Sequence, residues 1–192
     1  LKIVDFEENN KEIYFLGKLN QSRDFIFSNN LQENDKRFWD SWFGRCSGQN
    51  RLIPFVKIKM SRPRLWLFYI KLPELIYIGL GAYSTDLSGR SYPFILFSRH
   101  TPDSKVEDLE RQLKLFCTNT GTFRNILNNG KCLPEDYFNL DKNLQDFSLP
   151  AMLPQNKLLE NGIGGFWLEC ESGYCLEYEG LPTCSLFNKL FG

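Results

Sequence analysis

An acidic and a basic residue lie four positions apart in a polar stretch between two apolar segments. The acid is Asp86 and the base is Arg90, and the apolar segments are Leu75–Leu80 and Phe94–Phe97. The Ser, Thr, Asp and Gly residues of this stretch favour tight turns, and Gly89 tolerates a positive φ. The pattern predicts a strand, a structured loop and a second strand. In such a loop the carboxylate and the guanidinium can bond the backbone or each other.

Catalytic motifs are absent from the sequence. His100 is the only histidine, and nothing around it forms the nucleophile elbow of a serine or cysteine hydrolase. The glycines in 162–165 have neither the spacing nor the following Lys-Ser of a phosphate-binding loop, so we interpret them as a hinge or a strand entry. We therefore expect that the protein is not an enzyme and has no catalytic residue.

The cysteines predict neither a disulfide nor a metal site. There are six: Cys46, Cys117, Cys132, Cys170, Cys175 and Cys184. Their spacing is irregular, no signal peptide precedes them, and a core of ordinary size is available, so reduced thiols are expected. The last three could suggest zinc, but a Cys-x-x-Cys pair is absent and histidine is scarce. Neither a metal nor a cofactor is expected.

A set of polar residues from two loops and a helix remains as the candidate site for a partner or ligand. Its members are Lys18, Asp24, Asp40, Ser84, Asp86 and Arg90. They could line a ligand groove, because charged groups gathered in a cleft often mark function. They could also tie the two loops together and leave function to the surrounding surface, or carry out catalysis. We favour the structural tie.

Three stretches, in chain order, carry a resemblance to a known family. Gly17–Phe25 is similar to "G-K-L-P-x-x-G-D-F" and is followed by Trp39–Trp42 as "W-D-x-W"; Ser84–Pro93 matches "S-x-D-x-x-G-R-x-x-P"; Gly165–Trp167, Glu179–Pro182 and Phe187 resemble "W-W … G-L-P … F". This ordered set resembles the TagF family of regulators associated with bacterial type VI secretion. Asn20 stands where the family has proline, and Arg23 where it usually has glycine.

The resemblance implies a function. It implies a cytoplasmic regulator that represses the type VI secretion system after translation, by binding a component of that system. The forkhead-associated scaffold protein is the expected partner. Two alternatives stay open: a sensor of a small molecule or phospho-ligand that uses the region of Lys18 and Arg90, and an enzyme of unrecognised type that uses Asp24, Asp86 and Lys18.

Composition restricts the other classes of partner. Lys plus Arg equals Asp plus Glu, at 23 each, so no long-range field draws the chain to nucleic acid or anionic lipid. No uncharged apolar run reaches the roughly 18 residues that span a bilayer, and no signal peptide is recognised. We expect no nucleic-acid binding, no membrane insertion and a cytoplasmic location.

The fold class follows from the order of the apolar segments. Strand-like segments cluster early and helical ones follow, which predicts an α+β fold. We expect a single TagF-like domain over residues 1–192, with a mostly antiparallel sheet of about five strands and helices packed on it. A hairpin is expected around Ser172-Gly173. The basic residues Lys57, Lys59, Arg62 and Arg64 form either an anion site or a protected edge strand.

Helices are predicted from apolar spacing and from capping residues. The spacing of Leu31, Phe38, Trp42 and Cys46 predicts a helix over about 31–46, with Asn29 or Asn30 as its N-cap. Further helices are predicted to begin at Thr101 or Ser104, near Phe123, at Pro134 and near Pro182. Residues 149–161 are expected to form a long irregular connection.

Overall fold

Seven strands form one antiparallel sheet in the computed structural model, which describes residues 13–19, 22–47, 63–129, 153–154, 156–160 and 162–192. The strands are β1 (Ile13–Gly17), β2 (Ile26–Phe27), β3 (Leu65–Lys71), β4 (Ile76–Thr85), β5 (Ser91–His100), β6 (Gly164–Glu169) and β7 (Cys175–Glu179). Their order across the sheet is β2-β1-β5-β4-β3-β6-β7, and every pairing is antiparallel. The α+β fold class and the antiparallel sheet are therefore confirmed.

The expected number of about five strands is wrong. The C-terminal hairpin β6–β7 joins the main sheet, because β6 pairs with β3 from Lys71↔Gly164 to Trp66↔Glu169. At the other edge, β2 contributes only two residues, a length that carries no readable alternation. The turn around Ser172-Gly173 does connect β6 to β7 as expected.

The three central strands are buried on both faces. In β3 the side chains of Trp66, Phe68 and Ile70 belong to one core, whereas Leu67 and Tyr69 belong to the other. Successive side chains of a strand point to opposite faces, so a continuous apolar run such as Leu65–Ile70 is suited to a sheet that is covered on both sides. The two cores lie on opposite faces of the same sheet.

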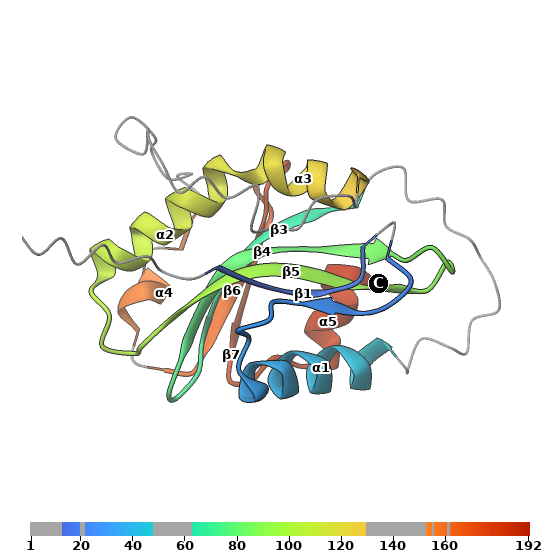
Figure 1. Cartoon of the computed structure of the whole chain (residues 1–192). Coiled ribbons are helices and arrows are strands. Elements are labelled where there is room, and N and C mark those ends of the chain that lie inside the picture. Colours follow the sequence, from blue (N-terminus) through green and yellow to red (C-terminus); the bar gives the residue numbers. More distant parts are fainter. Residues whose placement is uncertain (1–12, 20–21, 48–62, 130–152, 155, 161) are drawn as a thin grey trace, which may run out of the picture.

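Helices cover both faces and make three layers. Figure 1 shows α2 (Val106–Thr118) and α3 (Thr120–Asn129) over one face, and α1 (Glu33–Ser47) and α5 (Cys184–Phe191) over the other. The short helix α4 (Asn156–Leu159) adds Leu158 to the core beneath α2 and α3. No helix in the described ranges is long and apolar enough to cross a membrane.

The largest aromatic cluster lies beneath α1. Trp39 is fully buried, and its ring centroid lies 5.0–6.0 Å from the rings of its neighbours on α1, β3, β4 and β5. These neighbours are Phe38, Trp42, Phe43, Phe68, Tyr77 and Phe97. Aromatic pairs at such separations contribute beyond simple burial of area. The predicted apolar face of this helix is thus confirmed as its packing face.

The predicted N-caps are wrong for α1 and α2. The first helix begins at Glu33, and the backbone N–H groups of Asp35 and Lys36 bond to the carbonyl of Gln32 instead of to an Asn cap. The second begins at Val106, and no side chain caps it, because Thr101 and Ser104 bond each other in a preceding turn. Short polar side chains have several local partners, so sequence alone did not decide between a cap and a turn.

Other expectations for helices have mixed outcomes. Helix α3 contains the predicted segment near Phe123, and α5 begins two residues after Pro182, with Thr183 as the N-cap that accepts a bond from the Leu186 N–H. The connection expected to be irregular over 149–161 contains α4. The helix predicted to begin at Pro134 lies outside the described residues.

A disulfide joins Cys46 at the end of α1 to Cys184 at the start of α5. The prediction that all six cysteines are unbridged is therefore wrong. The two cysteines are 138 positions apart, and only the packing of α1 beside α5 brings them together, so their spacing could not reveal the pair. Cys117, Cys170 and Cys175 are free thiols.

Candidate functional site

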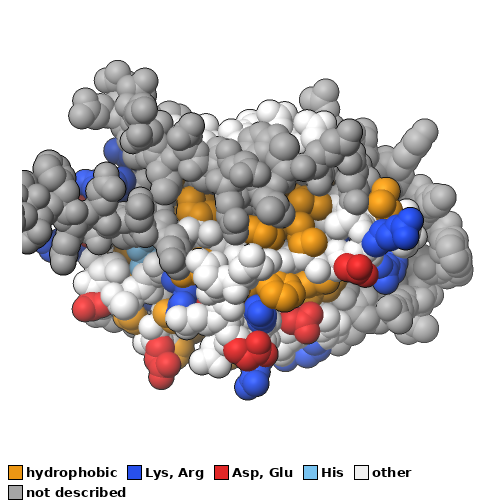
Figure 2. Space-filling model, in the orientation of Figure 1, with side chains coloured by type: hydrophobic (Ala, Val, Ile, Leu, Met, Phe, Trp, Pro, Cys, Tyr) orange, Lys and Arg blue, Asp and Glu red, His pale blue; other side chains and the backbone are white. Residues whose placement is uncertain are grey.

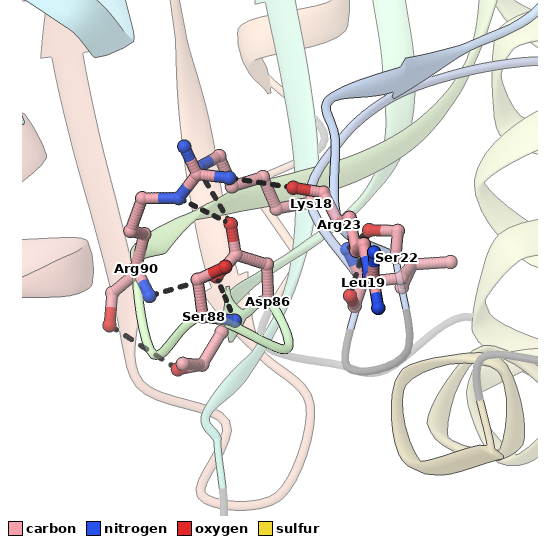
Figure 3. Close-up of polar contacts among 9 residues, drawn as sticks. Lys18, Leu19, Ser22, Arg23, Asp86, Ser88 and Arg90 are labelled. Atoms are coloured by element: carbon pink, nitrogen blue, oxygen red, sulfur yellow. Dashed lines mark hydrogen bonds and ion pairs between the residues drawn. The ribbon is translucent and has the colours of Figure 1, made fainter.

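Asp86 is the centre of a hydrogen-bond network at the end of β4. Its carboxylate is fully buried and accepts four bonds (Figure 3). Oδ1 accepts from the backbone N–H groups of Ser88 and Arg90, each at 2.9 Å. Oδ2 accepts from Lys18 Nζ at 3.0 Å and from Arg90 Nε at 2.8 Å.

The loop between β4 and β5 is shaped by the same residues. The backbone N–H of Asp86 donates to the carbonyl of Arg90 at 3.0 Å, and that of Gly89 donates to the carbonyl of Asp86 at 2.9 Å. Gly89 has φ +76°, a value that side-chain-bearing residues rarely adopt. The sequence-based prediction of a structured loop with an Asp86–Arg90 contact is confirmed.

This loop is also fastened to the segment between β1 and β2. Arg90 Nη2 donates to the carbonyl of Arg23 at 2.6 Å, and the N–H of Leu87 donates to the carbonyl of Ser22 at 3.2 Å. Lys18 reaches Asp86 from the same segment. We call Lys18, Ser22, Arg23, Asp86 and Arg90 the loop clamp. It joins two stretches that are more than 60 positions apart.

The electrostatics of the loop clamp favour an ionised Asp86. Burial by itself raises the pKa of this carboxyl, but the bonds from the Arg90 N–H, from Lys18 and from the Arg90 side chain outweigh burial and lower the pKa to about 2. A carboxylate that accepts several bonds is held in its charged form. It is therefore poorly suited to act as a general base near neutral pH.

The loop clamp has the contacts of a structural tie. Both oxygens of Asp86 are occupied, and Lys18 and the Nε of Arg90 are directed at the same oxygen. The Arg90 side chain nevertheless stays 58% exposed, although its Nη2 is bonded to the carbonyl of Arg23. Of the three interpretations of the polar set, this geometry favours the tie.

The remaining candidate residues do not join the loop clamp. Asp40 lies on the exposed side of α1 and accepts a bond from Tyr92 Oη at 3.1 Å. Asp24 is exposed, and its side chain has no hydrogen bond or ion pair within the described ranges; the side chain of Ser84 is buried in β4. The structure thus brings together Lys18, Asp86 and Arg90 of the six.

The basic cluster is described only in part. Arg64 forms an ion pair with Glu169 of β6, with 3.8 Å between Nε and Oε1. Lys57, Lys59 and Arg62 lie outside the described residues. Arg64, which directly precedes β3, therefore pairs with a residue of the neighbouring strand β6.

Sequence reasoning missed a second buried network, beneath the start of α1. Asp35 is fully buried; its Oδ1 accepts from Tyr77 Oη at 2.6 Å and lies 3.3 Å from Arg99 Nε. Burial raises the pKa of Tyr77, and the bond to Asp35 raises it further. In the sequence Asp35 has a sufficient local explanation, because an acidic residue suits the first turn of a helix. The signal for its partner was Arg99, the one cation inside the otherwise apolar run of β5.

Comparison with known proteins agrees with the ordered motifs. The pattern of the TagF N-terminal domain, described as type VI secretion system-associated, matches residues 14–131. A crystal structure of PA0076 from Pseudomonas aeruginosa PAO1 is similar in fold: the TM-score is 0.53 and the identity 18%, over 94% of each chain. No curated protein matches the sequence. Because the family pattern covers more than half of the chain, the protein belongs to the TagF family, whose N-terminal domain is associated with type VI secretion.

Proposed function

We propose that this protein is a negative regulator of the type VI secretion system that acts after translation, in the cytoplasm, by binding a protein component of the system. The proposed partner is the forkhead-associated scaffold protein. The observation that carries the proposal is the family match over residues 14–131, because it ties the chain to the secretion system. The direction of regulation and the partner come from the family resemblance.

The proposal includes no catalytic turnover. A serine and a histidine do lie in contact, with 2.9 Å between Ser98 Oγ and His100 Nε2. Ser98 is fully buried and His100 is 5% exposed, so a substrate could not reach this pair. Asp86, the most strongly perturbed carboxyl, is occupied by four donors.

The surface is consistent with protein recognition. Figure 2 shows acidic and basic side chains close to one another on the visible face, with hydrophobic side chains between them. Protein interfaces combine apolar contacts with scattered charges, whereas nucleic-acid interfaces are strongly basic. The alternative of a phospho-ligand sensor loses support, since Lys18 and Arg90 are directed at Asp86.

Overexpression in a bacterium with an active type VI system tests the proposal. Secretion of the tube protein into the medium should fall sharply, while its intracellular level stays constant. Tagged protein should co-purify with the scaffold, and purified scaffold should bind it directly in calorimetry. Unchanged secretion together with no direct binding to the scaffold would refute the proposal that the protein is a regulator.

A further inference from the structure

A largely apolar groove runs between α1 and the segment that links β7 to α5. Its volume is about 490 Å³. The residues that line it are Asn34, Arg37, Phe38, Ser41, Trp42, Arg45, Leu181 and Pro182. The first six follow helical spacing and form one stripe along α1, and Leu181 and Pro182 form the opposite wall. Leu181 is 60% exposed, so its side chain is accessible to a ligand in the groove.

The charges along the groove are of one sign. Arg37 and Arg45 line it, and among the residues that the structure describes no acidic side chain does. Arg37 forms an ion pair with Glu33, with 3.5 Å between Arg37 Nε and Glu33 Oε1, but the Arg37 side chain remains 75% exposed. Arg45 is exposed and forms no ion pair with any residue that the structure describes. A ligand with carboxylates beside an apolar group would complement this surface.

The two walls are held in place without a ligand. Trp42 Nε1 donates to the carbonyl of Thr183 at 3.1 Å, which fixes the α1 side against the residue after Pro182. The disulfide between Cys46 and Cys184 joins the same two segments covalently. A preformed site loses little conformational freedom when it binds, so the groove is ready to accept an occupant as it stands.

The dimensions indicate a peptide segment. From Asn34 to Arg45 the helix rises by about 16 Å, at 1.5 Å per residue. This matches about five residues of extended chain, at roughly 3.3 Å each. Two arginines at separate positions along such a groove would contact carboxylates at separate positions of a chain.

We propose that this groove binds an acidic segment of a protein partner, in which a large apolar side chain enters between the α1 stripe at Phe38 and Leu181, and flanking carboxylates pair with Arg45 and Arg37. This inference rests on the proposed function in one respect: the partner is taken to be a protein. It assigns α1, which carries Trp39–Trp42, and the segment with Leu181 and Pro182 to one binding surface.

Fluorescence anisotropy with a defined probe tests the groove directly. The probe is a short fluorescein-labelled peptide in which Leu and Phe alternate with Asp and Glu. Two matched peptides replace the acids by Lys or the apolar residues by Ser. The acidic apolar peptide should bind at least about tenfold more tightly than either matched peptide, and added salt should weaken binding.

Variants locate the binding. Arg45→Glu and Leu181→Ser should each weaken binding of the acidic apolar peptide by about tenfold or more. Arg111→Glu makes the same charge change on the exposed side of α2, across the sheet, and should leave binding unchanged. Arg45→Gln serves as a second variant if Arg45→Glu lowers the melting temperature. Absent binding at millimolar peptide, or equal binding by all variants, would overturn the proposal.

The groove and the regulator function fail in different ways. If the peptide binds as expected but overexpression leaves secretion unchanged and the scaffold does not bind, the regulator proposal is wrong and the groove stands. If overexpression silences secretion and the scaffold binds, but Arg45→Glu and Leu181→Ser leave scaffold affinity unchanged, the groove is not the interface. Each result therefore decides one proposal independently of the other.

Discussion

Opening the disulfide between Cys46 and Cys184 should destabilise the protein substantially. A crosslink limits the unfolded chain, and its entropic effect grows with the length of the closed loop. For the 138-residue separation of this pair, the chain-entropy relation gives about 17 cal/mol/K, or about 5 kcal/mol at 25 °C. We therefore expect reduction to lower the free energy of unfolding by about 3–5 kcal/mol, the smaller value allowing for residual structure in the unfolded state.

Urea unfolding with and without reductant measures this loss. Cys184→Ala should unfold like the reduced wild-type protein and should not respond to reductant, because it has no crosslink to lose. Cys117→Ala removes a free, half-buried thiol on the other face of the sheet and should keep the full response. Mass spectrometry of unreduced peptides should find residue 46 linked to residue 184.

Two results would refute this reasoning. Equal stability of the oxidised and reduced proteins would mean that the crosslink is absent or has no effect on the unfolded chain. A response to reductant that persists in Cys184→Ala would mean that a different cysteine pair is responsible.

Four further predictions concern the loop clamp and two glycines. The pKa of Asp86 falls to about 2 from 3.8, so its stabilising contribution is present above about pH 4 and is lost as the pH falls toward 2. Acid titration followed by circular dichroism should therefore show a smaller loss of stability between these two pH values for Asp86→Asn than for the wild-type protein. Arg90→Ala removes the bonds to Asp86 and to the loop between β1 and β2, so calorimetry should find a melting temperature about 3–6 °C lower; an unchanged value would place Arg90 among the binding residues instead. Gly44→Ala should stabilise α1 by about 0.5–1 kcal/mol, since nothing lies within 4 Å of the added methyl group. Gly79→Ala should destabilise the protein, because its Cβ would overlap the carbonyl oxygen of Leu96; urea melts of the two glycine variants should shift in opposite directions.

The sequence predicted the parts of the fold that depend on local pattern. The apolar runs of β3, β4 and β5 and the stripe of α1 were readable, because burial on both faces gives a strand a continuous apolar run and burial on one face gives a helix a period. The contact between Asp86 and Arg90 was predictable from its short separation, because two side chains four positions apart in a turn stay within reach of each other. Lys18 entered the candidate set through its position in a motif, and the structure places it on Asp86.

Contacts between distant segments were not predictable from one sequence. The pairing of β6 with β3, the buried network of Asp35 and Arg99, and the crosslink from Cys46 to Cys184 all depend on how the layers assemble. Nothing in the sequence marked Asp35 as part of a buried network, because an acidic residue in a first helical turn has a sufficient local explanation. Spacing cannot report which residue of another layer faces a given side chain.

The strand order has a consequence for where the chain can be cut. The recognised family pattern ends at residue 131, yet β6 and β7 complete the sheet beyond that point. A fragment ending there would leave the whole length of β3 as an open edge, and Phe68 would lose the ring of Trp167, 4.6 Å away. Long apolar edges recruit other chains, so such a fragment would aggregate. The stretch that marks the ancestry of this protein is therefore shorter than the sheet to which it belongs.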